Sequence, residues 1–224
     1  RVGDALRLSG AGYNVLTAVR TFTDATSRIS LGLVSGSSSN TVTLSVLETG
    51  PAEGYALYIA GDSDFNVVSY STITSYDSGT RTFEVDDSHD NLITNSLFYN
   101  PGGGTARIVN GSTRNTIAFS TLTAFGSSGA LEMLAGVSCN TVTGSVLVSG
   151  SGSVYALTVD GNFNTVSLSS FSHNFGAIRV GGSYNLLDRV SMAAEDSFGI
   201  VLTGSFNNVR RSTIAAAGEG LRAG

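Results

Sequence analysis

The residues best suited to acid/base chemistry form a short cluster near the middle of the chain, at Asp87, His89 and Asp90. Two carboxylates and an imidazole could give and take a substrate proton if they shared a site and held pKa values near the working pH. Asp is also common in exposed turns, where its side chain accepts hydrogen bonds from nearby backbone groups. We therefore expect a turn here and keep catalysis by these three residues as the alternative.

A second acidic group overlaps this segment and comprises Asp62, Asp64, Asp86 and Asp87. Asp62 and Asp87 each lie four residues before an Asn of the repeat described below. If the repeats stack, these two carboxylates face each other and repel unless a cation bridges them. Calcium prefers such clustered oxygen ligands. The sequence is therefore compatible with either a calcium site or a solvated turn here, and it predicts no other metal or cofactor.

A cationic group lies near the end of the chain, at Arg189, Arg210 and Arg211. In stacked repeats Arg189 would lie over Arg211, and Asp188 over Arg210. The planar guanidinium group pairs well with carboxylate and sulfate. We expect either a strip that binds an acidic glycan or a contact with a neighbouring coil or module.

The composition narrows the class of protein. The chain has 224 residues, of which 41% are hydrophobic and 13% charged. That apolar content suits a packed core rather than a disordered tract, and no apolar run reaches the roughly 20 residues of a membrane span. The net charge of −5 argues against nucleic acid as a partner. We expect no nucleic-acid binding and no membrane insertion.

A repeat organises almost the whole chain. Each copy has an Asn, an aliphatic residue two positions later, usually a Ser five positions later, and an apolar residue seven positions later. The anchors are 21–26 residues apart, at Asn14, Asn40, Asn66, Asn91, Asn115, Asn140, Asn164, Asn185 and Asn207. Ahead of most anchors lies a segment of alternating apolar residues that ends in Gly, such as YALYIAG at 55–61. Such alternation predicts strands.

A repeat this short cannot bury both of its faces alone, so we expect the copies to stack and pair in parallel. This predicts an all-β fold, a single-stranded parallel β-helix of about nine coils that forms one domain over residues 1–224. The Asn residues are expected to form a ladder at one corner, to adopt the left-handed backbone conformation there, and to donate to the Asn of the next coil. Phe163, Tyr184 and Phe206 each precede an anchor and would stack, either as a platform for a sugar or as a cover for the corner.

Repeats such as GSSSNTVTLSVL at 36–47 and GSTRNTIAFSTL at 111–122 resemble those of right-handed parallel β-helix proteins, the pectate-lyase-like superfamily. The resemblance covers residues from about 10 to about 220 and implies a right-handed coil. The superfamily includes polysaccharide lyases, glycoside hydrolases, alginate epimerases, phage tailspikes and stalks of surface adhesins. The fold alone therefore does not select a function.

One motif is similar to a catalytic motif of that superfamily. The run from Asp87 to Asp90 resembles the Asp-Pro-His-(Asp/Glu) motif of mannuronan epimerases, which implies acid/base roles for His89 and its neighbours, although Ser88 replaces the Pro. Uronate lyases and epimerases also usually place Lys or Arg beside metal-held carboxylates. Only Arg114 stacks near this segment, and we expect it to pair with Asp90 across adjacent coils.

Short, regular coils favour a structural role, because enzymes on such scaffolds need long loops to build a cleft. We predict a non-enzymatic stalk, fibre or adhesin that is extracellular or on the cell surface. We expect the chain to be a piece of a longer solenoid that stacks end to end on neighbouring modules or on copies of itself, and to contact polysaccharide. The alternative is a polysaccharide-active enzyme of the uronate lyase or epimerase type, or its inactive glycan-binding relative.

Overall fold

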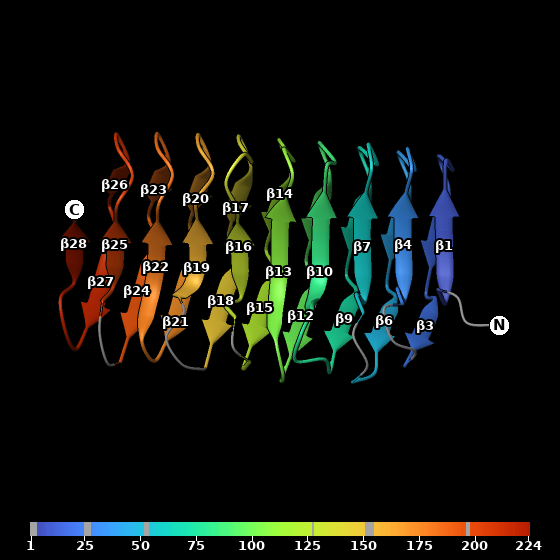
Figure 1. Ribbon diagram of the computed structural model, residues 1–224, viewed down its shortest axis with the longest axis horizontal. Coiled ribbons are helices and arrows are strands. Elements are labelled where there is room, and N and C mark those ends of the chain that lie inside the picture. Colours follow the sequence, from blue (N-terminus) through green and yellow to red (C-terminus); the bar gives the residue numbers. More distant parts are fainter. Residues whose placement is uncertain (1–3, 25–27, 52–53, 127, 151–154, 196–197) are drawn as a thin grey trace.

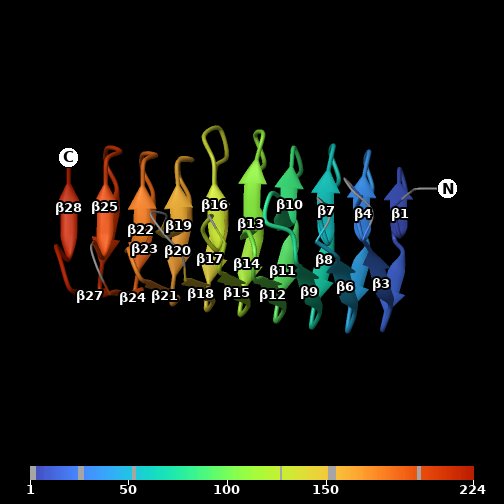
Figure 2. The ribbon, with the colours of Figure 1, turned by 60° about the horizontal axis from the view of Figure 1, so that its bottom comes forward.

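The computed structural model describes residues 4–24, 28–51, 54–126, 128–150, 155–195 and 198–224, which wind into a parallel β-helix (Figure 1). These residues contain strands and no helix. Three parallel sheets run along the long axis, and each coil contributes one strand to each of them in turn. Figure 2 shows the strands of the third sheet following one another along one edge of the molecule. The all-β prediction is confirmed.

The strand bounds are as follows. Sheet A contains β1 (Leu6–Ser9), β4 (Leu31–Val34), β7 (Leu57–Ala60), β10 (Arg81–Asp86), β13 (Gly104–Val109), β16 (Leu131–Met133), β19 (Tyr155–Val159), β22 (Gly176–Val180), β25 (Ile200–Leu202) and β28 (Leu221–Ala223). Sheet B contains β2 (Val15–Thr17), β5 (Thr41–Thr43), β8 (Val67–Ser69), β11 (Leu92–Thr94), β14 (Thr116–Ala118), β17 (Thr141–Thr143), β20 (Thr165–Ser167), β23 (Leu186–Asp188) and β26 (Asn208–Arg210). Sheet C contains β3 (Arg20–Thr23), β6 (Val46–Thr49), β9 (Thr72–Ser75), β12 (Leu97–Asn100), β15 (Thr121–Ala124), β18 (Val146–Ser149), β21 (Ser170–His173), β24 (Ser191–Ala194) and β27 (Thr213–Ala216).

Equivalent residues of successive coils pair in register, as Val42 does with Val68 in sheet B and Leu122 with Leu147 in sheet C. The position two residues after each Asn therefore forms one apolar column, and the position seven residues after it forms another. Both columns are buried in the central coils. The outward positions between them carry Thr or Ser in some coils, such as Thr43 and Thr72, and exposed apolar side chains in others, such as Leu44 and Tyr70.

The predicted asparagine ladder is present. Asn40 donates through its side-chain amide to Oδ1 of Asn66 at 3.0 Å and through its backbone N–H to the same oxygen at 2.9 Å. The same pair of bonds recurs at every step from Asn14 to Asn207. Each oxygen thus fixes a backbone donor of the preceding coil, which locks the register.

The corner conformation differs from the prediction. The left-handed residue is the one before each Asn, and these residues are Tyr13, Ser39, Phe65, Asp90, Arg114, Cys139, Phe163, Tyr184 and Phe206. The Asn side chain must point inward along the ladder, so the preceding residue makes the turn and directs its own side chain outward. The assignment of the left-handed conformation to Asn itself was wrong.

A second ladder holds the corner between sheets B and C. Ser71 accepts from the backbone N–H of Ser45 at 3.1 Å and donates to the carbonyl of Ser69 at 2.8 Å. The residue before each such Ser or its equivalent is again left-handed, and these residues are Ala18, Leu44, Tyr70, Asn95, Phe119, Gly144, Leu168, Arg189 and Arg211. Their side chains project from this corner, which is called the serine corner below.

A buried carboxylate organises one of the loops that lead from sheet C back to sheet A. Asp77 is 2% exposed and accepts from the backbone N–H groups of Gly79 at 3.0 Å and Thr80 at 2.8 Å. Burial acts to raise the pKa of this carboxyl, but the hydrogen bonds, led by that from the Thr80 hydroxyl, outweigh it and lower the pKa. The folded state therefore favours the ionised form.

A carboxyl with a lowered folded-state pKa stabilises the protein above its unfolded pKa of about 4, and that stability is lost as pH falls through the folded value. We expect Asp77→Asn to destabilise the protein at neutral pH and the difference from wild type to shrink in acid. Denaturant unfolding between about pH 7 and about pH 2 measures this. Asp62→Asn, an exposed carboxylate, is the control. A difference that stays constant across this range would contradict the role of the charge.

Candidate functional site

The predicted acid/base residues lie together at the asparagine corner, but one of them is occupied. Asp90 receives Arg114 Nε at 2.8 Å and Nη2 at 2.7 Å from the next coil, as the stacked register predicted. The hydrogen bond from Arg114 holds the pKa of Asp90 below its usual range, so this carboxyl stays ionised and is a poor proton donor. His89 places Nδ1 3.0 Å from the Thr113 hydroxyl. The cluster is therefore a paired turn with one free carboxylate, Asp87.

The four predicted calcium ligands do not form a single site in the structure. Asp62 and Asp87 meet, and His89 joins them, with one ligand atom of each within 4.8 Å of the others. Asp64 instead accepts from the backbone N–H of His89 at 2.6 Å. Asp86 lies on the outer face of sheet A, where the Tyr58 hydroxyl donates to it at 2.8 Å. Two carboxylates and an imidazole could hold a cation, but both carboxylates are exposed.

The three predicted arginines converge on one acidic residue. Asp188, whose side chain is 7% exposed, accepts from Arg211 Nε at 2.8 Å and Nη2 at 2.7 Å. Arg189 and Arg210 each place Nε 3.3 Å from it. Burial acts to raise the pKa of Asp188, but the hydrogen bond from Arg211 and the three positive charges outweigh it and lower the pKa. One carboxylate neutralises one of three cations, so the strip keeps a net positive charge.

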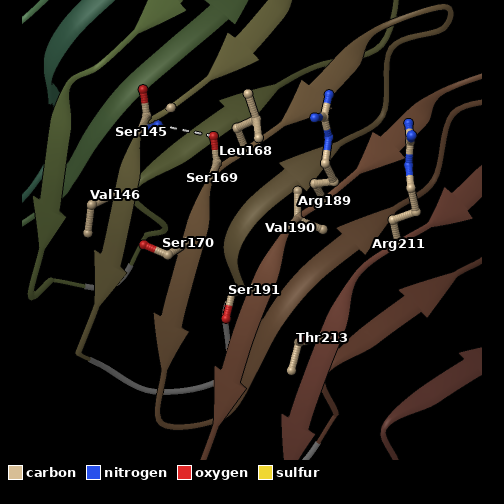
Figure 3. Close-up of a pocket in the computed structure, with 11 residues that line it drawn as sticks. Ser145, Val146, Leu168, Ser169, Ser170, Arg189, Val190, Ser191, Arg211 and Thr213 are labelled. Atoms are coloured by element: carbon tan, nitrogen blue, oxygen red, sulfur yellow. Dashed lines mark hydrogen bonds between the residues drawn. The ribbon is translucent and has the colours of Figure 1, made fainter.

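Arg189 and Arg211 also border a groove of about 330 Å³ at the serine corner. Figure 3 shows their side chains side by side, extended in the same direction from neighbouring coils. Across the groove lie the outward-facing hydroxyl residues Ser170, Ser191 and Thr213 of sheet C. Adjacent guanidinium groups facing a row of hydroxyls could bind a hydroxylated anion.

The outer face of sheet A carries a charged row that the sequence analysis missed. Tyr58, Glu84, Arg107 and Glu132 are successive neighbours in register on β7, β10, β13 and β16. The side chain of Glu84 is 5% exposed and accepts from Arg107 Nε at 2.6 Å. Burial raises the pKa of this carboxyl, and Arg107 only partly offsets the rise. Glu84 and Arg107 border a cavity of about 470 Å³ that also reaches Asp160.

Most charges of this face pair with one another. Arg81 reaches past one intervening coil to Glu132 at 2.7 Å and passes over Gly104, where a Cβ atom would come within 2.7 Å of Arg81 Cδ. Arg179 binds Asp160 at 2.7 Å. The available signal in the sequence was the single charged residue between apolar ones in segments such as TFEV at 82–85 and TARIV at 105–109. Such cross-strand pairs stabilise a sheet face.

The three aromatic residues of the asparagine corner are stacked. The ring centroids of Phe163 and Tyr184 lie 5.0 Å apart, and those of Tyr184 and Phe206 lie 4.9 Å apart, with the planes within 7° and 12° of parallel. The faces of the rings therefore cover one another, and the middle ring has no open face for a sugar. This geometry supports the second of the two predictions, a cover for the corner.

Comparisons with known proteins show which solved structures are similar to this fold. No family model and no curated protein sequence matches the chain. A mutant DFA-IIIase from Arthrobacter chlorophenolicus A6 in complex with DFA-III is similar in structure, with a TM-score of 0.69 and 14% identity over 99% of this chain and 60% of that chain. Tailspike protein 2 of Escherichia coli O157:H7 bacteriophage CAB120 gives a TM-score of 0.59 at 11% identity over 99% of this chain and 37% of that chain. An alginate lyase from Paenibacillus gives 0.50 at 14% over 91% and 99%.

These likenesses confirm the parallel β-helix fold and agree with the resemblance to the pectate-lyase-like superfamily. The chain spans 60% of DFA-IIIase and 37% of the tailspike protein. The described residues contain no helix that is long and apolar enough to cross a membrane.

Proposed function

We propose that the protein is a structural β-solenoid of a secreted or cell-surface stalk, fibre or adhesin, and that its surface contacts acidic polysaccharide. The main support for this proposal is the hydroxyl-lined groove beside Arg189 and Arg211. The groove lies on a β-helix in which the asparagine corner and the serine corner are each held by a ladder of hydrogen bonds. The ladders supply a stiff rod, and the arginines supply the one strongly cationic surface that we find in the described part of the chain. The bacteriophage tailspike among the similar structures is consistent with such a rod.

We further propose that coils stack end to end, with neighbouring modules or copies of this chain as partners. In the described residues β1 and β28 are the outermost strands of sheet A and pair on one side only, as β2, β26, β3 and β27 do in the other sheets. An open parallel edge presents unpaired backbone groups that another coil can extend. Electron microscopy of purified protein would show filaments, and a monodisperse monomer at high concentration would contradict this stacking.

Arg189→Ala is expected to weaken binding of an anionic polysaccharide about tenfold, because one charge-assisted contact is lost. Calorimetry with sodium alginate as the anionic probe and dextran as the neutral one measures this, at low and high salt. Arg7→Ala is the matched control, since both side chains are 53% exposed and Arg7 lies away from the groove on sheet A. Equal losses in the two variants, or equal binding of dextran, would contradict the proposal.

We propose that the protein needs no cofactor and that Asp62, Asp87 and His89 form a solvated turn. Both carboxylates are exposed, and water already screens the repulsion between them. Addition of EDTA is therefore expected to leave the melting temperature unchanged. A rise of several degrees with calcium, abolished in Asp87→Asn, would instead establish the calcium site.

A polysaccharide-active enzyme of the uronate lyase or epimerase type, or its inactive glycan-binding relative, is the second candidate. It is favoured by the buried Glu84 with its raised pKa beside a cavity, since such groups cluster at functional sites. An alginate lyase is among the similar structures, and its name gives an activity of this class. Unsaturated products from alginate or pectin that disappear in Glu84→Gln or His89→Ala would select this candidate over the structural one.

A further inference from the structure

A second groove continues the first along the same corner. It has a volume of about 620 Å³ and is lined on one wall by Leu44, Tyr70, Asn95 and Phe119. These residues occupy, in the preceding coils, the same position as Arg189 and Arg211 in the later coils. The aromatic ring of Phe119 reaches the next coil, because a Cβ atom on Gly144 would come within 2.6 Å of it. The two grooves therefore follow each other along the serine corner with the Phe119 ring at their junction, and together they are called the corner track below.

The corner track is rigid, and its free polar groups point outward. At the serine corner, the backbone N–H of each Ser donates to the hydroxyl of the equivalent Ser in the next coil. The backbone N–H one residue later donates to a carbonyl of the preceding coil, as that of Val146 does to the Ser120 carbonyl at 2.9 Å. The Ser hydroxyls themselves are consumed by the ladder. By contrast, the hydroxyls on the second wall, those of Thr72, Thr121, Ser170, Ser191 and Thr213, make no side-chain hydrogen bond in the described part of the chain. They are available to a ligand.

The corner track has a repeat of two coils. On the second wall, apolar and hydroxyl residues alternate over six coils as Val46, Thr72, Leu97, Thr121, Val146 and Ser170. On the first wall, the exposed aromatics Tyr70 and Phe119 stand in two of the hydroxyl-bearing coils, 62% and 63% exposed. Coils that pair in parallel are about 4.8 Å apart, so this pattern repeats about every 10 Å. That is close to the length of two sugars in an extended chain.

We propose that the corner track binds one extended, linear, anionic polysaccharide that lies parallel to the solenoid axis. Successive sugars lie on successive coils, the apolar faces of alternate rings pack on Tyr70 and Phe119, and acidic groups reach Arg189 and Arg211. This inference rests on the proposed glycan contact and adds its position, direction and length. An extended peptide fits less well, because the corner offers no unpaired backbone for strand addition.

The occupant follows from the chemistry of the track. Exposed aromatic rings and adjacent hydroxyls match the apolar and polar faces of a sugar. Two arginines at one end of the track supply the charge complementarity on a molecule whose net charge is −5. Eight coils, from that of Leu44 to that of Arg211, line the two grooves. A polymer is therefore required to fill the track, and a short oligosaccharide would contact only part of it.

The test is the chain-length dependence of binding, measured by calorimetry with size-fractionated oligomannuronates. Affinity is expected to rise with length up to about eight sugars, the number of coils in the track. Phe119→Ala and Tyr70→Ala are each expected to weaken binding of the longest oligomer about fivefold, which corresponds to the loss of one aromatic contact. Both variants should bind the tetramer like wild type, because the tetramer occupies the arginine end.

Phe65→Ala is the matched control, since Phe65 is 60% exposed and left-handed like Phe119 but lies at the asparagine corner. Equal effects of Phe65→Ala and Phe119→Ala, or an affinity that does not change with length, would overturn the corner track. If Arg189→Ala still weakened binding in that case, the proposed glycan contact would survive. Wild-type binding that is insensitive to Arg189→Ala would overturn the proposed contact itself. Melting curves establish that each variant is folded.

Discussion

Asn115→Ala is expected to lower the free energy of unfolding by about 4 kcal/mol, because it opens the asparagine ladder at its centre. Oδ1 of Asn115 accepts from the backbone and side-chain N–H groups of Asn91 at 3.0 Å each, and Nδ2 donates to the Ser88 carbonyl at 2.9 Å. Asn115 is 1% exposed, so water cannot replace these bonds. Each buried backbone group left without a partner costs about 1–3 kcal/mol. Thermal and denaturant unfolding measure the loss, with a fall in melting temperature of about 10 °C.

Asn115→Asp tests the direction of the ladder bonds. The aspartate can still accept from Asn91, but it cannot donate to Asn140. In the wild type, Nδ2 of Asn115 lies 3.2 Å from Oδ1 of Asn140, so in the variant a carboxylate charge faces that oxygen. We expect it to be at least as destabilising as Ala. Asn174→Ala is the control, since Asn174 is exposed and outside the ladder. A loss below about 1 kcal/mol in Asn115→Ala would mean that the ladder does not fix the coils.

The ladder was predictable because one residue type recurs at a nearly constant spacing and its side chain has one role. The left-handed position beside it was not predictable in the same way. In successive coils that position holds Tyr13, Ser39, Phe65 and Asp90, so aromatic, hydroxyl and acidic residues all occur there and no single type marks it. Their side chains project outward, so only the backbone is constrained there, and composition carries no trace of the constraint.

The ion pairs also differ in whether the repeat spacing alone predicted them. Asp90 and Arg114 stand one residue before consecutive anchors, so the repeat alone placed them together. Arg81 and Glu132 are 51 residues apart and meet across an intervening coil, which requires the strand register and the empty space over Gly104. Local pattern therefore gives neighbours within one column. It does not give side chains that reach past a neighbouring coil.

The strongest electrostatic effect is expected from Arg107→Ala, which removes the partner of Glu84. Glu84 lies in the middle of the sheet A face and is nearly inaccessible to water. An unpaired buried charge costs about 3–5 kcal/mol. The Tyr55 hydroxyl, 3.3 Å away, is too weak a donor to replace a guanidinium group. We expect a loss of stability of about 3 kcal/mol at neutral pH, measured by denaturant unfolding.

The pH dependence of that loss identifies its cause. Burial raises the pKa of Glu84 in the folded protein, and without Arg107 the rise is larger. A carboxyl with a raised folded-state pKa stabilises fully below its unfolded pKa, and that stability is lost as pH rises through the folded value. The defect of Arg107→Ala should therefore shrink towards about pH 4, where Glu84 is protonated, and grow towards neutral pH. Adding Glu84→Gln should recover much of the stability at neutral pH, because the uncompensated charge is gone. A defect that is independent of pH and persists in the double variant would instead assign the loss to the packing of the Arg107 side chain.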